Sequence, residues 1–413
     1  MTALGGHINH IYEDFDLRFR DLKSIFKMLG YADVDVYEKL DGQNLFIGWD
    51  FDKETLKVAR NKQNIKDGGL DRYGLSLKFG DRPEIESLFV NAYDVIHRAV
   101  SSLQYNIKSQ IFGSMGTVWY PVEIIDPDFP NTIHYSNKRI VFHEYGPVLF
   151  GMDGEPISNA LPRNLEILKL SIPSMNKEID LWKLIEPRCF PLNSIDDSII
   201  DKACFEVTEI QRKNKIDDAT TIRSFAASRL KEDMQRFPLI PEHVRNGVSK
   251  SLVKMQGAPT NKFLLASVDS TMRTLVKNMI DEEKNNVLPK ILNPIENIVH
   301  RFSSLLLSNM KSEYIDEATE EALRIKREYN RCCDIIRNGS NKNHIDLLHN
   351  LHPKIGTGMV TIEGLVFKFN ERVYKVTGSY APMNRIIAAV RYGEQKRTSN
   401  PNDIPLAMFM QSS

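Results

Sequence analysis

Hydrophobic and polar positions change their spacing three times along the chain. In the first part, helical spacing marks residues 11–30 and 84–105, which predicts two packing helices. Short apolar or alternating runs predict strands at residues 31–36, 45–49, 56–59, 111–113, 117–125 and 139–146, and a hairpin at residues 148–157 with Asp153 and Gly154 in its turn.

From residue 159 to residue 355 the spacing is helical, and prolines punctuate it. The predicted helices are residues 179–185, 199–216, 220–237, 244–255, 261–287, 291–307 and 313–337. Strands return at residues 359–369 and 372–378, with a turn at Asn370 and Glu371. A helix follows at residues 383–392, and Gly393 is expected to end it.

These patterns predict an α+β protein with an antiparallel sheet. A chain of 413 residues exceeds what one compact core usually holds. We therefore expect a sheet domain formed by residues 1–158 and 356–413, and an all-α domain of residues 159–355 inserted into it.

Composition narrows the class of protein. Hydrophobic residues make up 42% and charged residues 26%, as in soluble globular proteins. The 54 basic and 54 acidic residues balance, so nucleic-acid contacts would have to come from local patches. We expect no membrane span and no secretion, because long apolar runs and a signal-like N-terminus are both missing. Four cysteines without a Cys-x-x-Cys pair fit a reducing cytoplasm.

Lys39 is the first candidate for chemistry. It stands two residues before Asp41 and three before Gly42, between two apolar runs, which predicts a tight connection between strands. A lysine amine, with an ordinary pKa of about 10.4, is a poor nucleophile at neutral pH unless burial or a nearby cation disfavours its ammonium form. The tetrapeptide alone fits either a hairpin with a solvated lysine or a pocket with a reactive one.

Other polar residues occur at comparable places. Arg60 opens a basic loop, with Lys62 and Lys66, that faces either phosphate or only solvent. Glu123 interrupts an apolar strand, where a buried carboxylate needs a partner or a ligand. The hairpin near the C-terminus carries Glu363, Lys368 and Lys375, either as an ordinary charged hairpin or as part of a phosphate site. Basic groups for phosphate, an acid for a divalent cation and an attacking amine are what nucleotidyl transfer needs.

Taken in order, these motifs resemble the covalent nucleotidyltransferase superfamily of ATP-dependent ligases and capping enzymes, and above all its nick-sealing RNA ligases. The first motif of that family is Lys, any residue, an acid or His, Gly, any residue, Asn. It is matched by Lys39-Leu40-Asp41-Gly42-Gln43-Asn44. DNA ligases usually carry arginine in the last place, so Asn44 favours RNA ligation. The motif Glu-Gly-x-Val-x-Lys is matched by Glu363-Gly364-Leu365-Val366-Phe367-Lys368.

The resemblance implies a role for each matched residue. Lys39 would attack the α-phosphorus of ATP, Glu38 would read the adenine edge, and Arg60 would be the arginine of the second motif. Glu123 would touch the ribose, Phe142 would stack on adenine, and Glu363 would hold a divalent cation. The implied sets are Lys39, Asp41 and Lys375 for catalysis, and Glu38, Asn44, Arg60, Glu123, Phe142, Glu363 and Lys368 for the nucleotide, with Glu363 also for the metal.

The last motif departs from the family. Lys-x-Lys becomes Lys375-Val376-Thr377, and a threonine can donate a hydrogen bond but carries no charge. The resemblance covers residues 31–157 and 356–380. It implies an antiparallel-sheet nucleotidyltransferase domain of the ATP-grasp-like ligase kind, with the helical domain inserted before the last two motifs. The helical region carries basic groups that either face phosphate or are solvated; these are Arg223, Arg229, Lys231 and Arg236, and Arg324, Lys326, Arg327 and Arg331.

The implied activity has three steps and needs ATP and Mg²⁺, or Mn²⁺ in its place. Lysyl-AMP forms, AMP passes to a 5′-phosphate, and a 3′-hydroxyl displaces AMP to close the strand. The implied partner is nucleic acid with those ends, RNA in a nicked duplex for preference, and the implied role is RNA repair. Three alternatives stay open: DNA ligation, AMP or nucleotidyl transfer to another acceptor, and a non-catalytic nucleotide-binding or scaffold protein.

Overall fold

A computed structural model gives the fold and describes residues 8–143, 147–151, 155–158, 161–186, 189–190, 192–308, 316–339, 342–352 and 363–399. The turn predicted at Asp153 and Gly154, and residues 359–362 of a predicted strand, lie outside these ranges. Within them the protein is α+β, as the sequence predicted, and it has two largely antiparallel sheets where one was expected.

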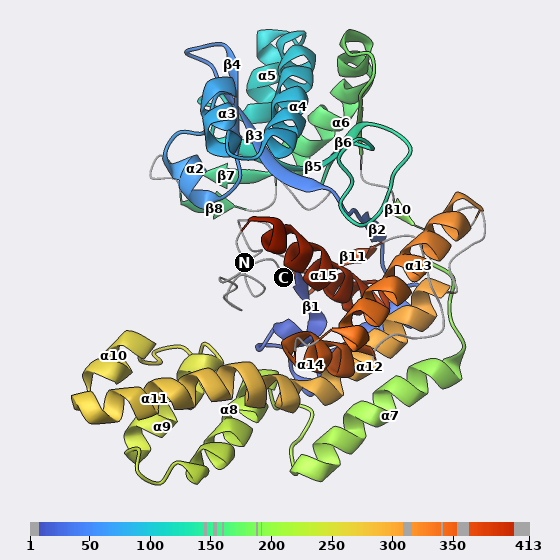
Figure 1. Cartoon of the computed structure of the whole chain (residues 1–413). Helices are drawn as coiled ribbons and strands as arrows, with labels where there is room; N and C mark the ends of the chain where they lie inside the picture. The colour runs from blue at the N-terminus through green and yellow to red at the C-terminus, as the bar shows by residue number, and fades with distance from the viewer. Residues whose placement is uncertain are drawn as a thin grey trace.

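The first sheet lies at the top of Figure 1 and takes its strands from one stretch of the chain. Its spatial order is β4 (Thr55–Ala59), β3 (Gln43–Asp50), β5 (Val118–Ile125), β6 (Arg139–Phe142) and β9 (Lys183–Ile185), with β7 (Val148–Phe150) and β8 (Pro156–Ser158) attached through β5. Neighbours are antiparallel except β6 and β9.

Helices cover one face of the first sheet. They are α3 (Arg72–Phe79), α4 (Pro83–Ser101), α5 (Tyr105–Phe112) and α6 (Pro162–Met175). The alternation of side chains along the strands explains this packing, because every second residue points to one face. On β3 these residues are Leu45, Ile47 and Trp49, and all three are buried in the core with the helices. The short helix α2 (Lys62–Lys66) follows β4.

The second sheet assembles strands from distant parts of the sequence. Its order is β1 (Asn9–His10), β12 (Arg372–Val376), β11 (Gly364–Phe369), β2 (Val36–Lys39) and β10 (Cys189–Phe190), and only β1 and β12 run parallel. One face packs against α1 (Phe19–Gly30), α7 (Asp197–Asn214) and α12 (Leu288–Ser308), with which it shares a single core. The second sheet and part of the helical region therefore form one packed unit.

The remaining helices form two groups. The first comprises α8 (Ile222–Asp233), α9 (Glu242–Leu252), α10 (Asn261–Ala266) and α11 (Ser270–Glu282), which a π-helical turn joins to α12. This group has a core of its own. The second comprises α13 (Asp316–Asn338), α14 (Lys342–Leu351) and α15 (Tyr380–Ser399), and it lies beside the second sheet in Figure 1. No helix in the described part of the chain combines the length and apolar character that a membrane span requires.

Several predicted elements are wrong or misplaced. Residues 179–185 were predicted as a helix, but Leu184 lies in β9, paired beside β6. Residues 111–113 were predicted as a strand, but Ile111 and Phe112 end α5 and Gly113 caps it. Short apolar runs of this kind fit a buried strand or a buried helix turn equally well. Strands also continue beyond residue 158, where we expected the sheet part to end.

Two helix boundaries and one strand also differ from prediction. The helix expected at residues 11–30 begins only at Phe19, after a short strand and a 3-10 turn. The strand expected at residues 31–36 is β2 instead, because Ala32 adopts a positive φ of 58° and the chain turns there. The final helix does not end at Gly393 but continues to Ser399. The turn predicted at Asn370 and Glu371 is confirmed, with positive φ at both residues.

Candidate active site

A large cavity lies between the facing surfaces of the two sheets and extends toward the helical region. Its volume is about 2110 Å³. Eight of the ten residues that the sequence singled out line it, namely Glu38, Lys39, Asp41, Asn44, Arg60, Glu123, Glu363 and Lys375. Phe142 and Lys368 do not. Residues from the two ends of the chain thus meet in one space.

Lys39 is the last residue of β2, and not part of a turn as predicted. It pairs in register with Gly364 of β11, so the preceding residue, Glu363, comes beside it. The Lys39 amine and the Glu363 carboxylate form a direct ion pair. Gly364 also permits the close approach of β12 on its other side, since a Cβ there would lie 2.1 Å from the carbonyl oxygen of Val376. The pairing register of β2 and β11 therefore brings the Lys39 amine and the Glu363 carboxylate together, and the site depends on this contact.

Lys375 occupies the same face of the second sheet. It pairs with Val366 on β11, and only 7% of the residue is exposed. Burial and the neighbouring Lys39 lower the pKa of Lys375 to about 8. Two lysines and one carboxylate are therefore grouped on this wall of the cavity.

The pKa values show how the group is charged. Burial alone would lower the pKa of Lys39, but the carboxylates of Glu363 and Glu123 outweigh it and raise the pKa above the ordinary lysine value. Burial raises the pKa of the Glu363 carboxyl. Lys39 is therefore an ammonium ion at neutral pH in this state, and it must exchange its partner or lose a proton before it can act as a nucleophile.

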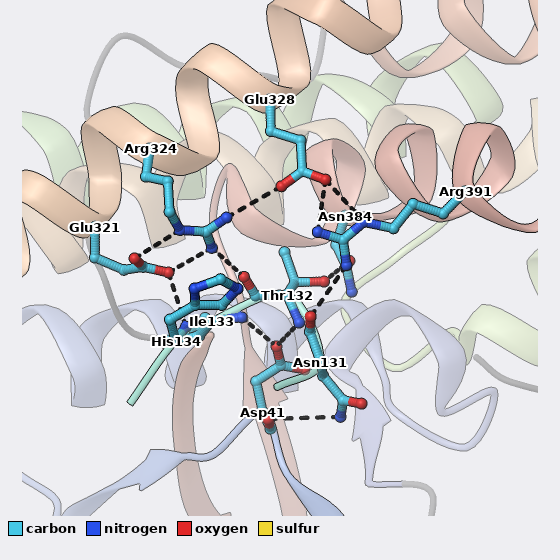
Figure 2. Close-up of polar contacts among 10 residues, drawn as sticks. All are labelled: Asp41, Asn131, Thr132, Ile133, His134, Glu321, Arg324, Glu328, Asn384 and Arg391. Atoms are coloured by element: carbon cyan, nitrogen blue, oxygen red, sulfur yellow. Dashed lines mark hydrogen bonds and ion pairs between the residues drawn. The ribbon is translucent and has the colours of Figure 1, made fainter. Parts of the chain in front are cut away.

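Asp41 makes contacts that fix the backbone around it. Its carboxylate Oδ2 accepts hydrogen bonds from the backbone amides of Thr132 (2.7 Å) and Ile133 (2.8 Å), as Figure 2 shows. Its own amide donates to the Tyr135 hydroxyl at 2.9 Å. These are positioning contacts, and the catalytic role expected for Asp41 stays a prediction.

Glu123 is the carboxylate of the opposite wall. It is buried, and its Oε1 accepts a hydrogen bond of 3.0 Å from the amide of Gly42. Its Oε2 lies 3.2 Å from the Nε2 atom of His143. The partners that a buried carboxylate requires are thus supplied by the Lys39 motif itself and by His143, the residue after β6.

Arg60 and Asn44 lie next to each other at the far side of this wall. The Arg60 guanidinium donates to the carbonyl oxygen of Asn44 and lies 4.7 Å from the ring centre of Phe89. Burial lowers the pKa of Arg60. A cation held in this way presents a fixed charge to the cavity.

The stacking position predicted for Phe142 is wrong. Phe142 pairs with Val122, so it points to the helix-covered face of the first sheet and is only 1% exposed. Glu123 points to the other face. The residue of this strand end that lines the cavity is His143, the next residue. The sequence does not give this register, and Glu123 and Phe142 would share a face if the two strands were shifted by one residue.

The remaining basic candidates lie elsewhere. Lys368 shares a face with Val366, but it lies near the hairpin tip and pairs with Glu371 at 2.7 Å. Lys62 and Lys66, expected to face phosphate, both pair with Glu155. None of these three lysines lines the cavity.

One further residue on the cavity wall has an unusual environment. Thr377, at the position where the ligases that the sequence resembles carry a second lysine, is 2% exposed and lines the cavity. Its hydroxyl has no hydrogen-bond partner among the residues that the structure describes. A buried hydroxyl without a partner is costly, and a ligand oxygen would satisfy it.

The described residues contain no group of three or more metal-ligating side chains. Mg²⁺ keeps several waters and takes one or two carboxylates, so Glu363 alone would suffice as the protein ligand. Its present partner is an ammonium ion, and a divalent cation could replace it at the same oxygen. The donor set therefore fits a weakly held magnesium ion.

Comparisons with known proteins add no relative. No family model matches the chain, and searches of curated proteins and of solved structures each return no match.

Proposed function

We propose that this protein is an ATP-dependent RNA ligase that works through a lysyl-AMP intermediate. The proposal is carried by one observation, the contact of Lys39 with Glu363 beside Lys375 in the cavity between the sheets. An amine, a carboxylate and a second cation at one point are what attack on a phosphorus atom requires. The ordered resemblance of the motifs to RNA ligases supports the choice of reaction.

The proposed first step forms a phosphorus–nitrogen bond. The Lys39 amine attacks the α-phosphorus of ATP, the bond to the bridging oxygen breaks, and pyrophosphate leaves. Lys39 gives up a proton before the attack, and exchange of its ion pair with Glu363 lowers the cost of this loss. Mg²⁺, when bound at Glu363, would supply positive charge to the phosphates. Lys375 and the hydroxyl of Thr377 would contact phosphate oxygens from the same wall.

The second and third steps transfer AMP and then release it. A 5′-phosphate oxygen of the polynucleotide attacks the phosphorus of lysyl-AMP, the phosphorus–nitrogen bond breaks, and the nitrogen of Lys39 takes up a proton from solvent so that it leaves as an amine. A 3′-hydroxyl then attacks the 5′-phosphorus, a phosphodiester forms, and AMP leaves. The size of the cavity supports this proposal, since about 2110 Å³ exceeds what a nucleotide alone needs.

The test is incubation with labelled ATP, and in parallel with labelled GTP, followed by denaturing electrophoresis. We expect a covalent adduct with ATP that Lys39→Ala abolishes while the circular dichroism spectrum is unchanged. Lys57→Ala is the matched control, because Lys57 also pairs with a carboxylate, Asp50, but lies outside the cavity. An adduct that survives Lys39→Ala would overturn the proposal. A nicked duplex with RNA or DNA at its 3′-hydroxyl side then distinguishes the two ligase activities.

A second candidate function, nucleotide binding without catalysis, is favoured by the ammonium state of Lys39 and by Thr377. It predicts saturable binding of ATP with no adduct at any pH. The same experiment, combined with equilibrium dialysis, separates the two.

A further inference from the structure

The three C-terminal helices form a cap beside the Lys39 motif. We define the cap as α13, α14 and α15, which share one core. Ile133, from the connection between β5 and β6, is buried in that core at 2% exposure. The connection is thus packed into the cap, although it belongs in sequence to the first sheet.

Two arginines of the cap bind the backbone of this connection. Arg324 of α13 donates to the carbonyl oxygen of Thr132, and Arg391 of α15 donates to that of Asn131 at 3.0 Å. Glu321 of α13 accepts a hydrogen bond of 2.8 Å from the amide of His134. Figure 2 shows these side chains converging on residues 131–134 from above.

Glu328 holds the two arginines in place. Its Oε2 lies 3.1 Å from Nη1 of Arg324, and its Oε1 accepts from Nε of Arg391 at 2.7 Å. Arg324 also donates to Glu321. Two arginines and two glutamates are thus balanced in charge and mutually hydrogen-bonded, with the glutamate side chains 14% exposed. A partly buried network of this kind holds geometry better than an isolated surface pair.

The same connection binds the Lys39 motif on its other side. The amides of Thr132 and Ile133 donate to Asp41, and the Asn131 side chain donates to the carbonyl oxygen of Gly42 at 2.8 Å. A continuous set of hydrogen bonds therefore runs from the cap, through residues 131–134, to Asp41 and Gly42 of the Lys39 motif. Thr132 also contacts Asn384 of α15 through its hydroxyl.

The cap is connected to the other half of the site as well. β12 carries Lys375, and α15 begins at Tyr380, only five residues later. The helix that supplies Arg391 is therefore attached directly to the strand that supplies Lys375. One group of helices with a shared core is therefore linked to the backbone on both sides of the cavity.

We propose that the cap positions Lys39 against Glu363, and that Arg324 and Arg391 are the positioning residues through which it acts. Neither guanidinium contacts Lys39, so both act through the 131–134 connection and Asp41. Loss of either arginine leaves a loop carbonyl without its charged donor and frees the connection to move. The Lys39 motif then loses the anchor at Asp41, and the Lys39 amine becomes more accessible.

The first experiment measures the accessibility of Lys39 without using catalysis. Each variant is treated with an amine-acylating reagent, and the modification of each lysine is followed in time by peptide mass spectrometry. In Arg324→Gln we expect the acylation rate of Lys39 to rise about tenfold relative to that of Lys57. The reason is that loss of one charge-assisted hydrogen bond shifts a local opening equilibrium by about this factor. Glu328→Gln, which keeps the side-chain size, is the second variant and should show a smaller rise.

The matched control is Arg337→Gln. Arg337 is on the same helix, its side chain is more than half exposed, and it forms an ion pair with Asp334 at 3.5 Å. It should leave the ratio of Lys39 to Lys57 acylation unchanged. An unchanged ratio in Arg324→Gln and in Glu328→Gln would overturn the proposal. Equal acceleration at Lys39 and Lys57 would overturn it too, because that result means general loosening and not positioning.

A second measurement rests on the proposed ligase function. In single-turnover adduct formation, Arg324→Gln should lower the maximal rate about a hundredfold, because a misplacement of about 1 Å causes a loss of this order. The ATP concentration at half-maximal rate should change little. Arg324→Lys should restore part of that rate, because it keeps the charge but not the two-pronged contact. If the unsubstituted protein forms no adduct, the proposed function fails, whereas the acylation experiment still decides on the positioning role.

Discussion

The two sheets differ in how they are assembled. The first draws its strands and its covering helices from residues 43–185, and its core runs only from Leu45 to Leu184. The second combines strands from both ends of the chain, and its core runs from Ile11 to Val376. The cavity lies between them, but its central ion pair, Lys39 with Glu363, belongs entirely to the second sheet. The charged centre therefore exists only when distant segments are brought together.

This difference has a consequence for local stability. Contacts that are close in sequence form at little entropic cost, whereas contacts between residue 39 and residue 363 must close a very long loop. The second sheet offsets that cost by sharing its core with α1, α7 and α12. The helical region thus does more than extend the protein, because it supplies the apolar surface that holds the ends of the chain together.

Truncating a buried side chain in the core of each sheet should give the largest difference between the two sheets. Phe367→Ala in β11 and Phe112→Ala in α5 each remove a fully buried ring, and each should cost about 3–5 kcal/mol of stability. In hydrogen exchange, Phe367→Ala should speed exchange in α1, α7 and α12 and leave α4 protected. Phe112→Ala should show the reverse. Uniform acceleration in both variants would mean that the sheets unfold as one unit, and the comparison would fail.

A pair of glycine substitutions tests the register of each sheet. Gly364→Ala would place a Cβ 2.1 Å from the carbonyl oxygen of Val376, so β11 and β12 must separate. We expect a loss of about 1–3 kcal/mol, and loss of the adduct as well, since Gly364 pairs with Lys39. Gly48→Ala, in β3, meets only the ring of Trp119 at 3.0 Å, and should cost about 1 kcal/mol or less.

Thermal unfolding and the labelled-ATP assay measure both glycine variants. We predict that Gly364→Ala lowers stability more than Gly48→Ala does. If Gly48→Ala were the more damaging variant, the strand pairing around Lys39 would be looser than the register indicates.

The pH dependence of adduct formation tests whether the ammonium form of Lys39, on the second sheet, controls the rate. Because Glu363 and Glu123 raise the pKa of Lys39 in spite of burial, the reactive amine is a minor form at neutral pH, and its fraction grows as pH rises toward that pKa. The adduct rate should therefore increase about tenfold per pH unit between pH 6 and pH 8 at saturating ATP. A rate that falls with rising pH, or stays level, would contradict control by the Lys39 ammonium.

Much of this site could be predicted from the sequence, because its motifs lie on short strands with clear alternation. The grouping of Lys39, Glu123, Glu363 and Lys375 in one cavity agrees with the expectation. The prediction for Phe142 was wrong because neighbouring residues of a strand point to opposite faces. Which face each residue takes depends on the pairing register with the next strand, and the sequence does not give that register. His143 was missed for the same reason.

The contacts of the cap could not be predicted, although helices at residues 313–337 and 383–392 were. Arg324 was expected either to face phosphate or to be solvated, and it does neither, since it binds glutamates and the carbonyl oxygen of Thr132. Such a contact joins residues 192 positions apart and leaves no periodic signal. Likewise β9 and β10 are two or three residues long, and their strand conformation comes from the partners they reach in space.

The smallest predicted effect concerns two lysines on one face of the same hairpin. Lys368 is 44% exposed and pairs with Glu371, whereas Lys375 is buried on the cavity wall. Lys368→Met should change stability by about 0.5 kcal/mol or less and leave the adduct rate within about twofold, because exposed ion pairs contribute little. Lys375→Met should lower that rate strongly in the same assay. If the two variants were equally impaired, Lys368 would bind the nucleotide as the family resemblance implies, and the hairpin tip would have to close over the cavity when ATP binds.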